Sequence, residues 1–129
     1  MIYDPDALLA LVAHFAEREG VPVPVNRTTL RAIVVEAGRL AAGQAADEPA
    51  ALFYASARRA RLFGKVATPF LDAVGGVQAD RVGLRLDATP LDIVLLRGQI
   101  AFDAVGWEEV RESFARWLRP GVPPKPSPR

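Results

Sequence analysis

The sequence predicts an all-α fold, a compact bundle of about six helices, as a single domain over residues 1–118. Apolar residues recur every three or four positions through most of the chain, which is the period of an amphipathic helix. Proline and glycine bound these stretches where helices begin and end. Besides a Pro-Val stretch at 21–25, the only extended candidate is Leu84-Arg85-Leu86, which is too short to start a sheet. A chain of 129 residues, 50% of them hydrophobic, has the size of one domain with one core.

The first two helices are expected on either side of a stiff connector. An Asp-Pro pair and a glycine bound a first helix over about 5–19. Residues 21–25 read VPVPV and cannot be helical, because each proline forces the residue before it into an extended conformation. A second helix is expected to begin at a cap, Asn26 or Thr28, and to end near Gly43. Its apolar positions have helical spacing: Leu30, Ile33, Val34, Ala37 and Leu40.

A third and a fourth helix are expected to meet at a corner rich in basic residues. The third runs from Asp47 until Gly64 stops it. Thr68, followed by Pro69, is expected to cap the fourth, which ends at Gly83. Turns between helices are exposed and often carry binding residues, so this corner is a candidate site.

The last two helices begin with clear signals. The segment Thr89-Pro90-Leu91-Asp92 matches a capping box with proline at the first helical position, so a fifth helix starts there. The final helix carries a stripe of apolar side chains at helical spacing: Trp107, Val110, Phe114 and Trp117. This stripe is interpreted as core, with a partner-binding groove formed by Trp107, Phe114 and Trp117 as the alternative.

Residues 119–129 read RPGVPPKPSPR, in which five of eleven residues are proline. Such a segment has almost no apolar surface to bury and few backbone donors for a helix or a ladder. It is therefore predicted to be a disordered tail. We expect its removal to change the free energy of unfolding by less than about 0.5 kcal/mol.

Composition excludes several classes of function. Sixteen basic and fifteen acidic residues leave a net charge of +1, which argues against bulk binding to nucleic acid. The chain has no cysteine, and its one histidine, His14, cannot form a ligand cluster alone. No metal or other cofactor is therefore expected. No apolar segment approaches the length of a membrane span, and no signal peptide is recognised, so a cytoplasmic protein is predicted.

The stretch VGLRLDATPLDIV at 82–94, followed by an amphipathic helix ending in WLR, resembles the back half of Doc toxins of the Fic/Doc (Fido) family. The order of helices and loops in residues 2–119 is similar to that family throughout, although the motifs outside 83–94 are weak. The resemblance implies the family's helical fold. It also implies a role as the toxin of a toxin–antitoxin pair. Members of the family transfer phosphoryl or nucleotidyl groups through the loop H-P-F-x-x-G-N-x-R.

An ungapped alignment from Leu84 places that loop on 61–69, where only Phe63 matches. Arg61 falls at the family's histidine, and a guanidinium stays protonated, so it cannot act as a general base. Lys65 falls at the position of the family's acidic residue that holds Mg²⁺, so a positive charge replaces a negative one. The glycine, asparagine and arginine of the motif fall on Val66, Ala67 and Pro69. The resemblance therefore implies a degenerate site with no catalytic residue, and the chain is not expected to be an enzyme of the family type.

The corner is nevertheless a candidate anion site. Basic side chains lie at the end of one helix and a hydroxyl at the start of the next, so that a phosphate could meet both: Arg58, Arg59, Arg61, Lys65 and Thr68. The alternative is that these cations simply favour a helix C-terminus on a solvated face.

Three functions remain open. The preferred one is a degenerate Fic/Doc-like toxin component that acts through protein contacts, with an antitoxin as the expected partner and self-association as a further option. The second is a phosphoryl or nucleotidyl transferase with a non-standard site built on Thr68, Lys65 or the arginines. The third is a small nucleic-acid-binding helical module, in which residues 25–38 resemble a helix-turn-helix and the nucleic acid is bound by the basic side chains of the corner: Arg58, Arg59, Arg61 and Lys65.

Overall fold

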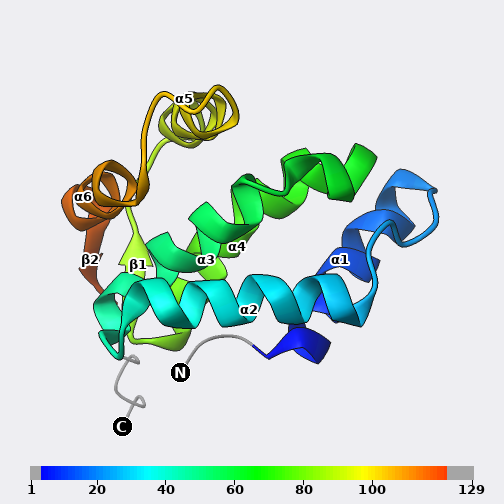
Figure 1. The fold of residues 1–129 in the computed structure, drawn as a ribbon, viewed down its shortest axis with the longest axis horizontal. Helices are drawn as coiled ribbons and strands as arrows, with labels where there is room; N and C mark the ends of the chain where they lie inside the picture. Colours follow the sequence, from blue (N-terminus) through cyan, green and yellow to red (C-terminus); the bar gives the residue numbers. More distant parts are fainter. Residues whose placement is uncertain (1–3, 122–129) are drawn as a thin grey trace, which may run out of the picture.

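The computed structural model describes residues 4–121 and contains six α-helices, which confirms the all-α prediction (Figure 1). The helices are α1 (Pro5–Glu19), α2 (Arg27–Ala41), α3 (Glu48–Ala57), α4 (Ala67–Arg81), α5 (Pro90–Ala101) and α6 (Trp107–Trp117). Two 3-10 helices, η1 (Ala45–Asp47) and η2 (Ala60–Val66), precede α3 and α4, respectively. The strands β1 (Leu84–Leu86) and β2 (Leu118–Pro120) form a small sheet.

Local capping defines the starts of three helices as expected. The Asp4 carboxylate accepts hydrogen bonds from the backbone N–H groups of the first turn of α1. Asn26, rather than Thr28, caps α2, since its side chain accepts from the N–H of Thr29 at 2.9 Å. At α5 both hydrogen bonds of the capping box between Thr89 and Asp92 form.

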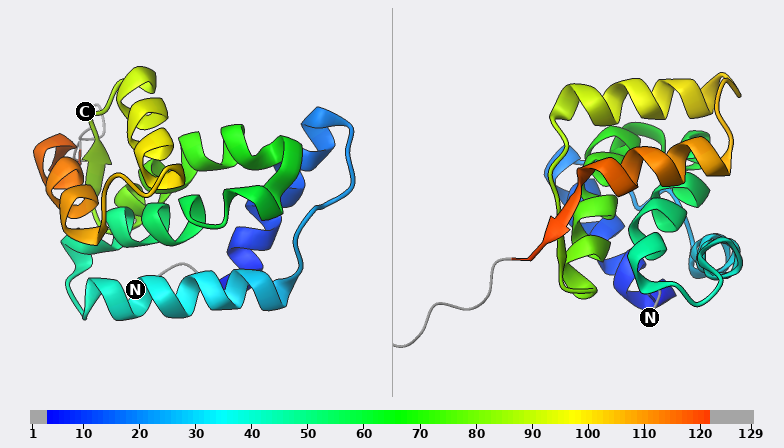
Figure 2. Two further views of the ribbon diagram at one scale, coloured as in Figure 1. Left: turned by 45° about the horizontal axis from the view of Figure 1, so that its top comes forward. Right: turned by 90° about the vertical axis from the view of Figure 1, so that its left-hand side faces the viewer.

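Helix α3 lies at the centre of the molecule, between α2 and α4 and against α6 (Figures 1 and 2). Every residue of α3 except Tyr54 is buried, so this helix has no solvated face. Its one charged residue, Glu48, accepts a hydrogen bond of 2.8 Å from Nε2 of the buried Gln78 on α4. An apolar helix that is buried on all sides packs against core residues of its neighbours, and α3 contributes six residues to the core: Ala50, Ala51, Leu52, Phe53, Ala55 and Ala57.

The aromatic stripe of α6 is divided between the core and its edge. Phe114 is fully buried, with its ring centroid 5.3 Å from that of Phe53. It packs so closely on α4 that a Cβ atom placed on Gly75 would lie 3.0 Å from the ring. Trp107 and Trp117 are half-buried beside it. Phe114 therefore offers no surface to a partner, and the alternative of a three-residue partner groove is wrong for this residue.

The two strands correct the predicted start of the tail. Leu84, Arg85 and Leu86 pair antiparallel with Pro120, Arg119 and Leu118. The N–H of Gly121 also donates to the Gly83 carbonyl at 3.0 Å. Residues 119–121 are thus part of the ordered fold, because an edge strand tolerates a proline that need not donate. The prediction of a disordered tail otherwise concerns residues 122–129, which lie outside the described residues.

The corner between α3 and α4 also differs from expectation. Helix α3 ends at Ala57, and a 3-10 turn rather than a continued α-helix leads to α4. Gly64 has a φ of 51°, which a residue with a side chain rarely adopts. Thr68 does not cap α4, because the helix already begins at Ala67 without a side-chain cap. The tighter turn shortens the connection and keeps Phe63 in the core, stacked on Phe70 with ring centroids 4.6 Å apart.

Candidate functional site

The candidate site is the corner formed by the end of α3, the 3-10 helix η2 and the start of α4. Phe63 and Val66 of η2 are fully buried, which anchors the segment to the core. Residues on the other side of a turn anchored in this way face outward. Arg61, Leu62 and Lys65 are accordingly exposed.

Arg58 and Arg59 are paired with a carboxylate that the sequence did not reveal as their partner. Nη1 of Arg58 donates to Oε1 of Glu36 on α2 at 2.5 Å, and Nη1 of Arg59 donates to the other carboxylate oxygen. Arg59 also donates to the Ala55 carbonyl at 3.0 Å. One carboxylate against two guanidinium groups leaves a single positive charge, so this pair attracts an anion less strongly than two free arginines would.

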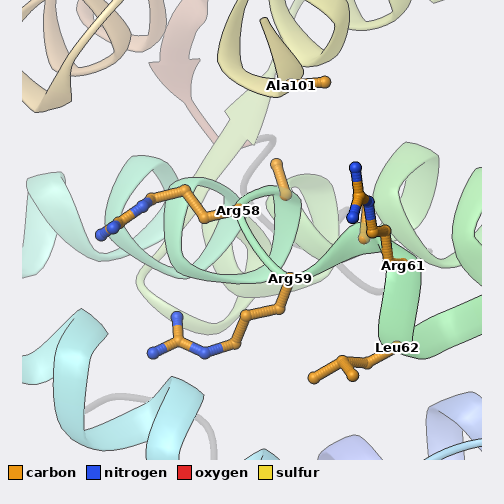
Figure 3. A pocket seen from close by; sticks show the side chains of 7 residues that line it. Arg58, Arg59, Arg61, Leu62 and Ala101 are labelled. Carbon is orange, nitrogen blue, oxygen red and sulfur yellow. The ribbon is translucent and has the colours of Figure 1, made fainter. Parts of the chain in front are cut away.

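Arg61 lies apart from the paired arginines. Figure 3 shows its guanidinium extending toward the helix that carries Ala101, whereas Arg58 and Arg59 extend in another direction. The side chains of these arginines, with Leu62 and three alanines, line a cavity of about 310 Å³. Four of the seven lining residues are apolar, so the cavity suits a ligand that has both an apolar and an anionic part.

A second cavity of about 310 Å³ lies beside the first, since Ala60 and Ala101 line both. Thr68 and Arg97 are its polar lining residues. Nη1 of Arg97 is buried without a hydrogen-bond partner among the described residues and lies 3.9 Å from Oδ1 of Asp72. The two cavities form a groove between α5 on one side and η2 with α4 on the other, which we call the arginine groove.

The five predicted anion-site residues are only partly brought together. Arg58, Arg59 and Arg61 line one cavity and Thr68 lines the other. Lys65 is exposed and lines neither of these two cavities. The anion-binding role of Lys65 therefore stays a prediction.

Two residues of this region were missed by the reasoning from sequence. Glu36 is the only acidic residue in the α2 segment, and Arg97 is the only basic residue in the α5 segment. Neither residue stands out in the sequence, because α2 also carries three arginines and α5 also carries Asp92. What the sequence could not show is which cation faces Glu36, because α2 and α3 meet only in the folded chain.

Other electrostatic features lie outside the groove. The pKa of Arg111 on α6 is raised, mainly by the hydrogen bond that its guanidinium donates to Asp47, whose carboxylate oxygen lies 3.2 Å away. Arg111 thereby ties α6 to η1.

Over residues 4–121 no group of three or more carboxylate, histidine or cysteine side chains could hold a metal ion.

Comparison with known proteins adds no relative. No protein-family model matches the chain, and no curated protein matches it. The groove must therefore be interpreted from its own geometry and charge.

Inorganic phosphate is expected to bind the corner weakly, and Glu36→Gln is expected to strengthen binding. The substitution removes the carboxylate that neutralises Arg58 and Arg59 while preserving the shape of the side chain. For one partly exposed charge, an increase in affinity on the order of fivefold is expected at low salt. Titration with phosphate, followed by NMR shifts of residues 57–68, measures it.

Glu112→Gln is the matched control, because it makes the same change in net charge on an exposed position of α6. It should leave phosphate affinity unchanged. Equal gains in both variants would show that only overall charge matters, and shifts confined to residues far from the corner would remove the anion site.

Proposed function

We propose that this chain is a degenerate Doc-like component of a cytoplasmic toxin–antitoxin-type pair, which lacks the family's catalytic motif and acts through protein contacts. The observation that supports this proposal most strongly is the position of Arg61. Arg61 takes the place of the family's histidine in the alignment and extends its guanidinium beside an apolar cavity. A permanently charged group in that place supports binding of an anionic side chain rather than removal of a proton.

The resemblance has one point of structural support in the corner itself. Phe63, the only position that matches the family loop, is fully buried and stacked on Phe70. A buried aromatic residue at this point suits the anchoring role that the motif implies. Within residues 4–121 no helix has the length and apolarity that a membrane crossing requires.

The arginine groove is the proposed contact surface for the protein partner. Its apolar floor includes Leu71 and Val94, and its cations include Arg61 and Arg97. A partner segment that alternates apolar and acidic side chains would bury the former and pair the latter with the arginines. The transferase and nucleic-acid alternatives have no comparable support, since Lys65 lies outside both cavities and two of the arginines are already paired.

Incubation of the purified chain with radiolabelled ATP, Mg²⁺ and cell lysate is expected to transfer no label to any protein. The reason is that a base and a metal-binding acid are missing at the aligned positions, Arg61 and Lys65. Label that appears on a protein band and disappears with Arg61→Ala would contradict the proposal and favour the transferase alternative.

The purified chain can also be used to test whether the proposed partner binds the arginine groove. The product of a neighbouring small gene, an acidic or DNA-binding antitoxin, is expected to bind, and Arg61→Glu should weaken binding at least about tenfold by placing like charges together. Arg31→Glu, on an exposed position of α2 away from the groove, is the matched control. Equal loss in both variants, or no loss in either, would assign the contact to another surface.

A further inference from the structure

Helix α5 is apolar on two opposite sides. Ile93, Leu96 and Ile100 face the core and are no more than 5% exposed. Since each residue of a helix advances by about 100°, the positions opposite to them are 91, 95, 98 and 102. These positions hold Leu91, Leu95, Gly98 and Phe102, which we call the outer α5 face.

The outer α5 face is open to solvent. Leu91 is 64%, Leu95 58% and Phe102 88% exposed. Figure 2 (right) shows α5 running along the outer edge of the molecule, where none of the other helices covers it. The only charged residues in the helix, Asp92 and Arg97, lie on its flanks rather than on this face. An apolar helix face is normally buried, so this face lacks a partner among the described residues 4–121.

We propose that the outer α5 face is the contact between two copies of this chain, packed antiparallel about a two-fold axis that passes between the two α5 helices at the level of residues 96 and 97. This axis places Leu91 opposite Phe102 of the second copy. It also places Leu95 opposite Gly98 of the second copy, so that a large side chain meets the smallest residue. The interface is isologous, as a closed dimer requires.

Self-complementarity favours a second copy over a different protein. A Cβ atom added to Gly98 would meet nothing within 4 Å, so there is open space at the point where Leu95 of the second copy would enter. Gly98 also lines the second cavity of the arginine groove, so this space borders that cavity. The face carries no charge that would select a charged partner. Complete burial of the exposed parts of Leu91, Leu95 and Phe102 on both copies would remove roughly 1,000 Å² from water, which is the lower limit for a specific interface.

Sedimentation of the full chain over a range of concentrations tests the proposal. We expect a reversible monomer–dimer equilibrium with a dissociation constant in the range of about 10 to 100 μM, typical of a small apolar interface. Leu95→Arg should raise that constant at least about tenfold, because it would bury a charge without a partner. Val35→Arg, the same type of change at an exposed valine of α2, should leave it unchanged.

A swap of residue size tests the predicted pairing. Gly98→Leu makes the face more apolar but fills the space for Leu95 of the second copy, so it should weaken the dimer about tenfold or more. Adding Leu95→Ala to Gly98→Leu restores one large and one small residue at each pair and should recover most of the affinity. Circular dichroism would show that each variant keeps its helices.

Three outcomes would overturn the proposal. They are a wild-type chain that keeps the mass of one copy up to about 500 μM, a Leu95→Arg variant that dimerises as well as the wild type, and a Gly98→Leu variant that dimerises as well or better. The last result would show that the face associates non-specifically through its apolar area and would favour a different partner. The ATP assay and the Arg61→Glu measurement are made on chains that keep Gly98 and do not depend on dimer formation, so failure of the dimer and failure of the proposed function are distinguishable.

Discussion

Replacement of Phe114 by alanine is expected to lower the free energy of unfolding by roughly 3 to 5 kcal/mol, a large share of the stability of a domain of this size. The ring is fully buried and contacts the rings of Phe53 on α3 and Trp117 on α6. It also fills the space above Gly75 on α4. Removing it leaves a cavity where three helices meet, which the surrounding backbone cannot close. Urea or thermal unfolding measures the loss.

Phe102→Ala is the matched control, because the same side chain is removed from a position that is 88% exposed. In the monomer, at low protein concentration, this change should cost less than about 0.5 kcal/mol. Similar losses in the two variants would mean that burial does not set the cost, and a negligible effect of Phe114→Ala would place its ring outside the core.

Ending the chain at Leu118 is expected to lower the free energy of unfolding by about 1 to 2 kcal/mol relative to a chain that ends at Gly121. The shorter chain loses the pairing of Arg119 and Pro120 with β1. It also loses the hydrogen bond from the Gly121 N–H to the Gly83 carbonyl. The connection that leads from α4 into α5 would then have an open edge.

The chain ending at Gly121 is itself the control, since it keeps every described contact of the sheet. Thermal melts of both truncated chains and of the full chain give the comparison. If the two truncated chains melt at the same temperature, the β1–β2 pairing contributes no stability, and the earlier expectation that all of 119–129 is dispensable would hold after all.

The neutralisation of Arg58 and Arg59 by Glu36 affects how the corner can act. A phosphate ligand would compete with a carboxylate that is already in place and 17% exposed. A partner with apolar as well as acidic side chains does not depend on that competition alone, because the exposed Leu62 and Val94 of the groove contribute apolar area. This difference is why protein contact is the better-supported function of the groove.

Features that depend on a few neighbouring residues were predictable from the sequence. The caps at Asp4 and Thr89, the exclusion of helix from 21–25 and the apolar stripe of α6 follow from interactions within about four positions. Neither the side chains nor the backbone need any distant partner for these features. The number and type of the main elements could therefore be predicted correctly.

Features that depend on residues far apart in the sequence were decided by the tertiary structure. Leu84–Leu86 forms a strand only because Leu118–Pro120 returns beside it, about thirty residues later. Arg58 and Arg59 lose one of their two positive charges only because α2 brings the Glu36 carboxylate within hydrogen-bond distance. Helix α5 is apolar on two opposite sides, and packing against α3 and α4 decided which side became core and which remained exposed. The physical reason is the same in each case: hydrophobic periodicity and capping act locally, whereas strand pairing, ion pairing and the choice of a buried face depend on which surfaces the folded chain brings together.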